Sequence, residues 1–312
     1  MKITFWGSPE AAVIVLDRLI GDGQDVAAVV TQPDKPAGRK RIVTACAVAA
    51  RAKEKGLTVF QPEKLRDEVF ARELQLIGAD AAVVVAYGKL IPADLLALPR
   101  FGFLNVHFSL LPRHRGASPV AAAILAGDRE TGVTIMRLDQ GLDTGPVLAQ
   151  RTMTLTGDDR TGPLTTGLAE AGAGAIAELL RKLEAGDEIP AKAQDESLAT
   201  LCRPIEKGDG RIDWNLPAAD LDRRLRAFDP WPGVFSMLGS ERVKVKQARP
   251  DPDDTGGAVE PGMMLKVSGE EITVSTGRGS LVLVRVQPEG KGEMSAGAFA
   301  HGRRLVPGAK FS

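Results

Sequence analysis

A continuous apolar run at residues 81–86 constrains the fold of this chain more than any other sequence feature. Strands that are apolar on both faces belong to parallel sheets covered by helices on each side. Further strand-like runs at 3–5, 26–30 and 103–108 alternate with helical patterns. Strands that alternate with helices predict a doubly wound α/β sheet for the first part of the chain.

The pattern changes in the second part of the chain. Residues 189–206 lack periodicity and contain two prolines, so they are predicted to be a linker. Beyond them, one helical pattern at 218–227 precedes short strand-like runs separated by Gly and Pro, which is typical of a small β-barrel. The sequence therefore predicts a Rossmann-like domain at 1–188 and a small OB-like β-barrel at 207–312.

Two local features give finer predictions. Ser8 and Pro9 follow the first apolar run and predict that a helix begins there, with Ser8 as its N-cap. Trp214 and Trp231 flank the helical pattern at 218–227. They are interpreted as packing residues rather than as surfaces on which nucleic-acid bases stack.

Composition limits the class of partner and the compartment. The chain has 40 Lys and Arg against 40 Asp and Glu, so any nucleic-acid site must be a local patch. Cys46 and Cys202 are too few and too distant for a disulfide framework or a zinc site, which favours a reducing, cytoplasmic setting and predicts no metal. No apolar run approaches the roughly 18 residues of a membrane span, so no membrane partner is expected.

Asn105 and His107 are the strongest candidates for catalysis. They lie two residues apart on a predicted strand, so both side chains share one face. The strand ends before Pro112, and α/β sheets bind ligands beyond the carboxyl ends of their strands. An amide and an imidazole can both donate hydrogen bonds to an oxygen that gains negative charge.

A carboxylate would complete this pair by orienting His107. Asp143, in a glycine-rich stretch, is the first candidate and Asp139 the second. A histidine at a strand end often serves packing alone, and an aspartate beside glycines is often a turn residue. The residue pattern by itself therefore indicates an α/β enzyme of unspecified chemistry.

Two motifs resemble the signature of the formyltetrahydrofolate-dependent transferases. They are Asn105-Val-His107 with Ser109-Leu-Leu-Pro112 and Arg115-Gly116, and then Leu142-Asp143-Thr144-Gly145. The resemblance implies that Asn105, His107 and Asp143 are the catalytic trio and that 10-formyltetrahydrofolate is the co-substrate. It also implies a folate site, formed by Ser109, Leu110, Leu111 and Pro112.

Three further segments resemble the members of this family that formylate methionyl-initiator tRNA. They are residues 31–39, the pair 211–214 and 226–232, and residues 286–291. The resemblance implies tRNA binding by Arg39, Lys40 and Arg41, since such charges contact phosphate without reading bases. A solvated loop is the alternative from charge alone. A monomer is expected.

The resemblance leaves rivals and implies a mechanism. Glycinamide ribonucleotide and amino-sugar formyltransferases share the trio, as would a formyl-folate hydrolase, and a silent tRNA-binding protein is a rival of another class. In the expected mechanism the amine attacks the formyl carbon directly, while Asn105 and His107 donate to the oxyanion. Asp143 is expected to raise the pKa of His107 and favour its protonated form.

Overall fold

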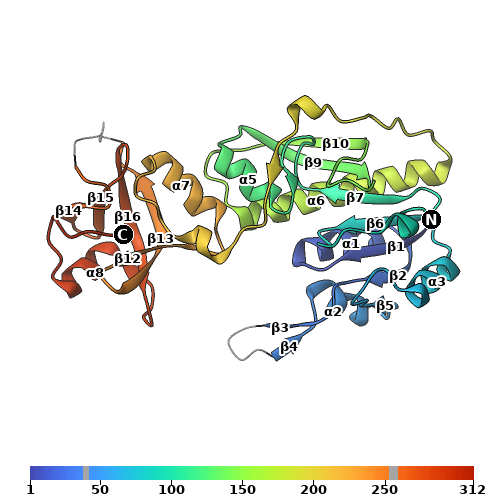
Figure 1. Cartoon of the computed structure of the whole chain (residues 1–312), viewed down its shortest axis with the longest axis horizontal. Coiled ribbons are helices and arrows are strands. Elements are labelled where there is room, and N and C mark those ends of the chain that lie inside the picture. Colours follow the sequence, from blue (N-terminus) through green and yellow to red (C-terminus); the bar gives the residue numbers. More distant parts are fainter. Residues whose placement is uncertain (38–41, 253–258) are drawn as a thin grey trace. The chain divides into compact units, whose positions relative to one another are not determined.

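The computed structural model describes residues 1–37, 42–252 and 259–312 (Figure 1). These residues divide into two compact units, each with its own sheet. The first unit holds Met1–Val120, Arg129–Leu155 and Pro163–Arg203, and the second holds Ala121–Asp128, Thr156–Gly162 and Pro204–Ser312. Within the described ranges, no helix is both long and apolar enough to cross a membrane.

The first unit is built on a seven-stranded sheet in the order β10-β9-β7-β6-β1-β2-β5. The strands from β5 to β7 run parallel, whereas β9 is antiparallel to β7 and β10 to β9. All five residues of β6 are buried, as its apolar run predicts. The strands are β1 Lys2–Gly7, β2 Asp25–Val30, β5 Val59–Phe60, β6 Ala81–Val85, β7 Phe103–His107, β9 Glu130–Arg137 and β10 Val147–Thr154.

Helices between the strands complete the predicted Rossmann-like arrangement, which is confirmed (Figure 1). The long α6 covers β7 and β9 so closely that a Cβ added at Gly172 would lie 2.6 Å from Val106 Cγ1. The helices are α1 Glu10–Gly21, α2 Ala47–Glu54, α3 Glu68–Ile77, α4 Ala93–Leu96 and α6 Thr161–Ala185. Most of α5 Pro119–Ala126 belongs to the second unit. A short hairpin of β3 Lys35–Ala37 and β4 Ile42–Thr44 lies between β2 and α2.

The start of α1 differs from the prediction. Pro9 is the N-cap and makes no side-chain capping bond, so the assignment of Ser8 as N-cap is wrong. The Ser8 hydroxyl instead accepts the backbone N–H of Gln32 at 3.2 Å. This bond ties the turn after β1 to the end of β2, an interaction across 24 residues that no local pattern contains.

An aromatic cluster lies under the parallel strands. Trp6 is fully buried, and its ring meets those of Phe70, Tyr87 and Phe103 edge-on, with centroids 5.1–5.9 Å apart. The indole N–H donates to Thr4 Oγ1 at 3.1 Å, so the one polar atom of the ring is satisfied. The cluster joins β1, α3, β7 and the segment after β6 into one core.

The second unit contains the predicted antiparallel β domain. Its strands run in the order β12-β13-β16-β15-β14, and β17 pairs with β16. Both edges are bonded to the last residues of the chain, since Ser312 exchanges backbone bonds with Met237 and Ala309 O accepts from Met264 N–H. The elements are α7 Ala218–Ala227, β12 Val234–Leu238, β13 Glu241–Pro250, β14 Met264–Ser268, β15 Glu271–Ser275, β16 Ser280–Pro288, β17 Met294–Ser295 and α8 Ala296–Arg303.

The two tryptophans of this unit behave differently. Trp214 is buried and its indole N–H donates to Ser236 Oγ at 2.9 Å, which confirms its packing role. Trp231 is 55% exposed, so the packing interpretation is wrong for this residue.

Candidate active site

Asn105 and His107 lie on one face of β7, opposite Met136 and Thr134 of the antiparallel β9. Both are buried, at 9% and 6% exposure. Among the residues that the structure describes, no hydrogen bond reaches the Asn105 side-chain amide. The amide atoms are not among the described side-chain atoms that are shut off from solvent without a partner, so the unused donors can reach a polar group of a ligand.

The structure brings Asp143 to His107 across 36 residues of sequence. His107 Nδ1 lies 3.7 Å from Asp143 Oδ2, which is an ionic contact rather than a hydrogen bond. Asp143 Oδ2 also accepts the backbone N–H of Gly116 at 2.8 Å. On the other side of the ring, His107 Nε2 is 3.0 Å from the carbonyl oxygen of His114. The ring is therefore held between two oxygen acceptors.

Asp139, the alternative carboxylate, has a local role. Its Oδ1 accepts the backbone N–H of Gly141 at 3.0 Å and the hydroxyl of Thr144 at 2.7 Å. These bonds form an exposed turn in the loop that carries Asp143. Asp139 is thus a turn residue that shapes the loop.

Burial lowers the pKa of His107 below its usual 6.5, because the charged imidazolium loses its hydration. Asp143 and the His114 carbonyl act in the opposite direction and do not outweigh burial. Asp143 therefore raises the pKa of His107 as expected, but the net shift is downward because burial outweighs this effect. A neutral imidazole at neutral pH can accept a proton, and both acceptors then stabilise the charge that forms.

This pKa shift predicts a loss of stability in mild acid. The unfolded chain binds the His107 proton at a higher pH than the folded protein, so the stability is complete above pH 6.5 and is lost as the pH falls through the folded-state pKa. We expect the free energy of unfolding to fall in this window by about 1.4 kcal/mol for each pH unit. Denaturant titrations between about pH 5 and 8 measure it.

The matched comparison uses two histidine variants. His107→Gln should show a shallower pH dependence than the wild type, whereas His301→Gln, at an exposed position of α8, should follow the wild type. A wild-type dependence retained in full by His107→Gln would contradict the assignment of the shift to His107.

The loop after β7 is fixed to the neighbouring strands. Thr134 Oγ1 donates to Ser109 O at 2.7 Å and accepts the Leu111 N–H at 3.1 Å. Gln150 Nε2 donates to Leu111 O at 2.9 Å. The Ser109 hydroxyl is buried and donates to Arg113 O at 2.6 Å, so it is already engaged.

The four residues expected along the folate therefore differ in what they offer. Ser109 and Leu111 are buried, whereas Leu110 and Pro112 are half-buried and keep exposed surface. The peptide bond between Leu111 and Pro112 is cis. Leu110, Pro112 and the loop backbone are the parts that a ligand could contact.

Residues that the sequence analysis missed join this site from the stretch 189–206. Lys192 pairs with Val147, and β11 Leu201–Cys202 pairs in parallel with β8 Arg115–Gly116. Gly116 has φ +117°, and a Cβ there would lie 2.2 Å from Cys202 O, so only glycine fits this contact. The side chain of Gln194 bonds the backbone of the Asp143 loop, and that of Glu196 bonds Arg115. Such contacts could not be predicted, because the stretch 189–206 has no periodic pattern.

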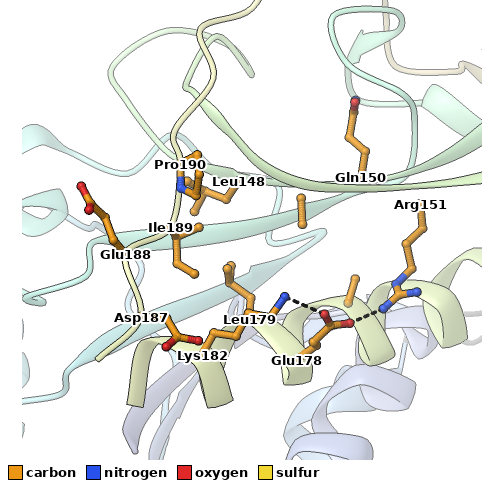
Figure 2. Close-up of a pocket in the computed structure, with 12 residues that line it drawn as sticks. Leu148, Gln150, Arg151, Glu178, Leu179, Lys182, Asp187, Glu188, Ile189 and Pro190 are labelled. Carbon is orange, nitrogen blue, oxygen red and sulfur yellow. Dashed lines mark hydrogen bonds and ion pairs between the residues drawn. The ribbon is translucent and has the colours of Figure 1, made fainter. Parts of the chain in front are cut away.

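A separate cavity of about 730 Å³ lies at the edge strand β10, beside α6 and residues 187–190 (Figure 2). Its polar wall is an ion-paired group, since Glu178 bonds both Arg151 at 2.5 Å and Lys182 at 2.8 Å. None of Asn105, His107 and Asp143 lines it.

The residues expected to contact tRNA, Arg39, Lys40 and Arg41, lie outside the described residues. Within the described part of the chain, His, Cys, Asp and Glu side chains form no metal-holding group.

Comparison with known proteins covers both units. The formyl transferase family profile matches residues 1–180, and the profile of the formyl transferase C-terminal domain matches 204–304. The chain is 48% identical to a methionyl-tRNA formyltransferase of Anaeromyxobacter dehalogenans over 97% of both chains.

Two solved structures share the fold. WlaRD, a sugar 3N-formyl transferase in the presence of dTDP and 5-N-formyl-THF, matches with a TM-score of 0.69 at 17% identity over 93% of this chain and 98% of that one. HypX from Aquifex aeolicus in complex with tetrahydrofolic acid matches with a TM-score of 0.61 at 20% identity, over 96% of this chain and 47% of that one.

Proposed function

This chain belongs to the methionyl-tRNA formyltransferases, and from that premise we propose that it moves a formyl group from 10-formyltetrahydrofolate to the amino group of methionine on initiator tRNA. The observation that carries the proposal is the 48% identity over 97% of both chains. The buried Asn105 amide with unused donors supports it, because a reaction through an oxyanion needs such a donor.

The proposed reaction joins the methionine nitrogen to the formyl carbon and breaks the bond from that carbon to N10 of the folate. The amine is the nucleophile, so no covalent intermediate with the protein is required. Asn105 donates to the oxygen that becomes negative in the tetrahedral intermediate. Neutral His107 takes the proton that the amine loses, and the same proton passes to the departing N10.

Asp143 and the His114 carbonyl support this proton transfer. Each faces one nitrogen of the His107 ring, at 3.7 Å and 3.0 Å. While the imidazolium exists, its Nδ1–H faces Asp143, whose carboxylate offsets the charge, and Nε2 exchanges the proton with the substrate once it leaves the His114 carbonyl. In this proposal His107 can also donate to the oxyanion, once its bond to the His114 carbonyl opens on substrate binding. Hydrogen bonds at active sites often take their catalytic geometry only when the substrate binds.

The remaining assignments follow as proposals. Residues 1–188 would carry the chemistry, residues 207–312 would bind tRNA, and 189–206 would connect them. Arg39, Lys40 and Arg41 would contact tRNA phosphates. Both cysteines, Cys46 and Cys202, are free, which supports a cytoplasmic setting. The enzyme would act as a monomer, which its mass in solution tests.

Competition between acceptors tests the function directly. Purified protein and 10-formyltetrahydrofolate are mixed with methionyl-initiator tRNA, glycinamide ribonucleotide and an amino-sugar nucleotide, and each product is quantified. We expect formylation of the tRNA alone. Formylation of either small acceptor would retain the catalytic trio and overturn the tRNA assignment, and release of formate without any acceptor would indicate a hydrolase.

A further inference from the structure

Gln194 reaches the loop that carries Asp143. Its Nε2 donates to two backbone carbonyls of that loop, to Asp143 O at 2.8 Å and to Gly145 O at 2.7 Å. The amide group of Gln194 thus uses both of its N–H donors on backbone carbonyls of the loop that carries Asp143. The two bonds fix the loop at two points, 49 and 51 residues away in the sequence.

Arg115 fixes the orientation of this amide. The Gln194 Oε1 accepts from Arg115 Nε at 3.0 Å and from Nη2 at 2.9 Å. Arg115 is 4% exposed, and its guanidinium also bonds Glu196 at 2.7 and 2.8 Å. Since the amide oxygen is held by a buried cation, the amide nitrogen must face the carbonyls of the Asp143 loop.

The backbone of Asp143 needs such support. Its φ is +54°, in the left-handed region, which residues other than glycine adopt uncommonly. Its carboxylate must at the same time face His107 and the Gly116 N–H. A bond to its own carbonyl, such as that from Gln194, holds the residue in this conformation.

The same network contains both partners of the His107 ring. Arg115 lies between His114, whose carbonyl meets Nε2, and Gly116, whose N–H binds the Asp143 carboxylate. Gln194 bonds the Arg115 side chain on one side and the Asp143 backbone on the other. The side chain of Gln194 therefore joins the segment that faces Nε2 of His107 to the loop that faces its Nδ1.

We propose that Gln194 is a positioning residue for formyl transfer, which holds the Asp143 loop so that the carboxylate faces His107. This inference rests on the proposed function for its catalytic consequence. Its geometric part, the placement of Asp143 against His107, stands apart from the acceptor that the enzyme uses.

The first test measures geometry without activity. The chain contains three histidines, so NMR can follow the titration of each imidazole, and His107→Gln assigns the signal of His107. Asp143 raises the pKa of His107 against the larger effect of burial. In Gln194→Ala the loop is released, and we expect the His107 titration to move to lower pH than in the wild type.

The second test measures catalysis. A misplacement of about 1 Å can reduce a rate roughly 100-fold, so we expect kcat of Gln194→Ala to fall about 10- to 100-fold with both KM values nearly unchanged. The acidic limb of the kcat profile should move to lower pH together with the His107 titration. Gln194→Met keeps the side-chain length without adding a charge and loses both donors, so it should resemble Gln194→Ala.

The matched control is Gln75→Ala, at an exposed position of α3, which should behave like the wild type in every assay. If Gln194→Ala does not fold, Gln194→Met provides the same readouts. An unchanged kcat, or a lower kcat with an unmoved His107 titration, overturns the positioning role. A wild type that does not formylate tRNA, together with a moved titration in Gln194→Ala, refutes the proposed acceptor and retains the role of Gln194.

Discussion

Replacing His107 with alanine is expected to lower kcat for formyl transfer to methionyl-initiator tRNA by about 100- to 1000-fold, since the substitution removes a group that transfers the proton. His107 is the ionisable member of the trio that meets oxygen acceptors at both ring nitrogens. The KM for tRNA should change little, because the proposed tRNA contacts lie elsewhere. Steady-state kinetics with varied tRNA and varied folate separate the two parameters.

Controls distinguish loss of chemistry from loss of structure. His301→Ala changes an exposed histidine of α8 and should retain the wild-type kcat. His107→Asn keeps a hydrogen-bonding side chain without the capacity to carry a proton, so it should be nearly as impaired as the alanine variant. A His107→Ala enzyme within a few-fold of wild-type kcat would refute the proton-transfer role.

Replacing Trp6 with alanine is expected to lower the free energy of unfolding by about 3–5 kcal/mol, the range for truncating a buried aromatic residue. Trp6 is fully buried, and it loses three edge-on ring contacts together with the bond to Thr4. Such ring pairs contribute about 0.5–1.5 kcal/mol each beyond the area they bury. Urea titration followed by far-UV circular dichroism measures the change.

Trp231→Ala is the matched comparison, because it removes the same side chain from a position that is 55% exposed. Its effect should stay below about 1 kcal/mol, as is usual for surface substitutions. Equal losses for the two tryptophan variants would contradict the assignment of Trp6 to the core of the first unit.

The sequence was sufficient for the fold where the signal is local. The apolar run of β6 is buried at all five residues, and the helical pattern at 218–227 coincides with α7. Prediction failed where a long-range bond replaced a local one. Ser8 has the chemistry of an N-cap, yet its hydroxyl binds the backbone of Gln32, 24 residues away.

The candidate site likewise has features that local sequence patterns predicted and features that they did not. The spacing of two residues placed Asn105 and His107 on one face. The residue pattern offered Asp143 as the first partner of His107 and Asp139 as the second, and the resemblance to a family then assigned Asp143. The effect of Asp143 on the pKa of His107 has the expected direction, but the net shift is downward because of burial, which the charges along the chain do not encode. Gln194 was missed because its bonds run from a side chain to backbone atoms in a stretch without periodicity.

The positive φ of Asp143 limits which substitutions can measure the contribution of its carboxylate. Alanine at this position would remove the charge and also disfavour the left-handed backbone, so the two losses would be added together in any measured rate or stability. Asparagine is tolerated in this region and keeps the shape of the side chain. Asp143→Asn therefore isolates the electrostatic contribution, and an alanine scan of this loop would overstate it.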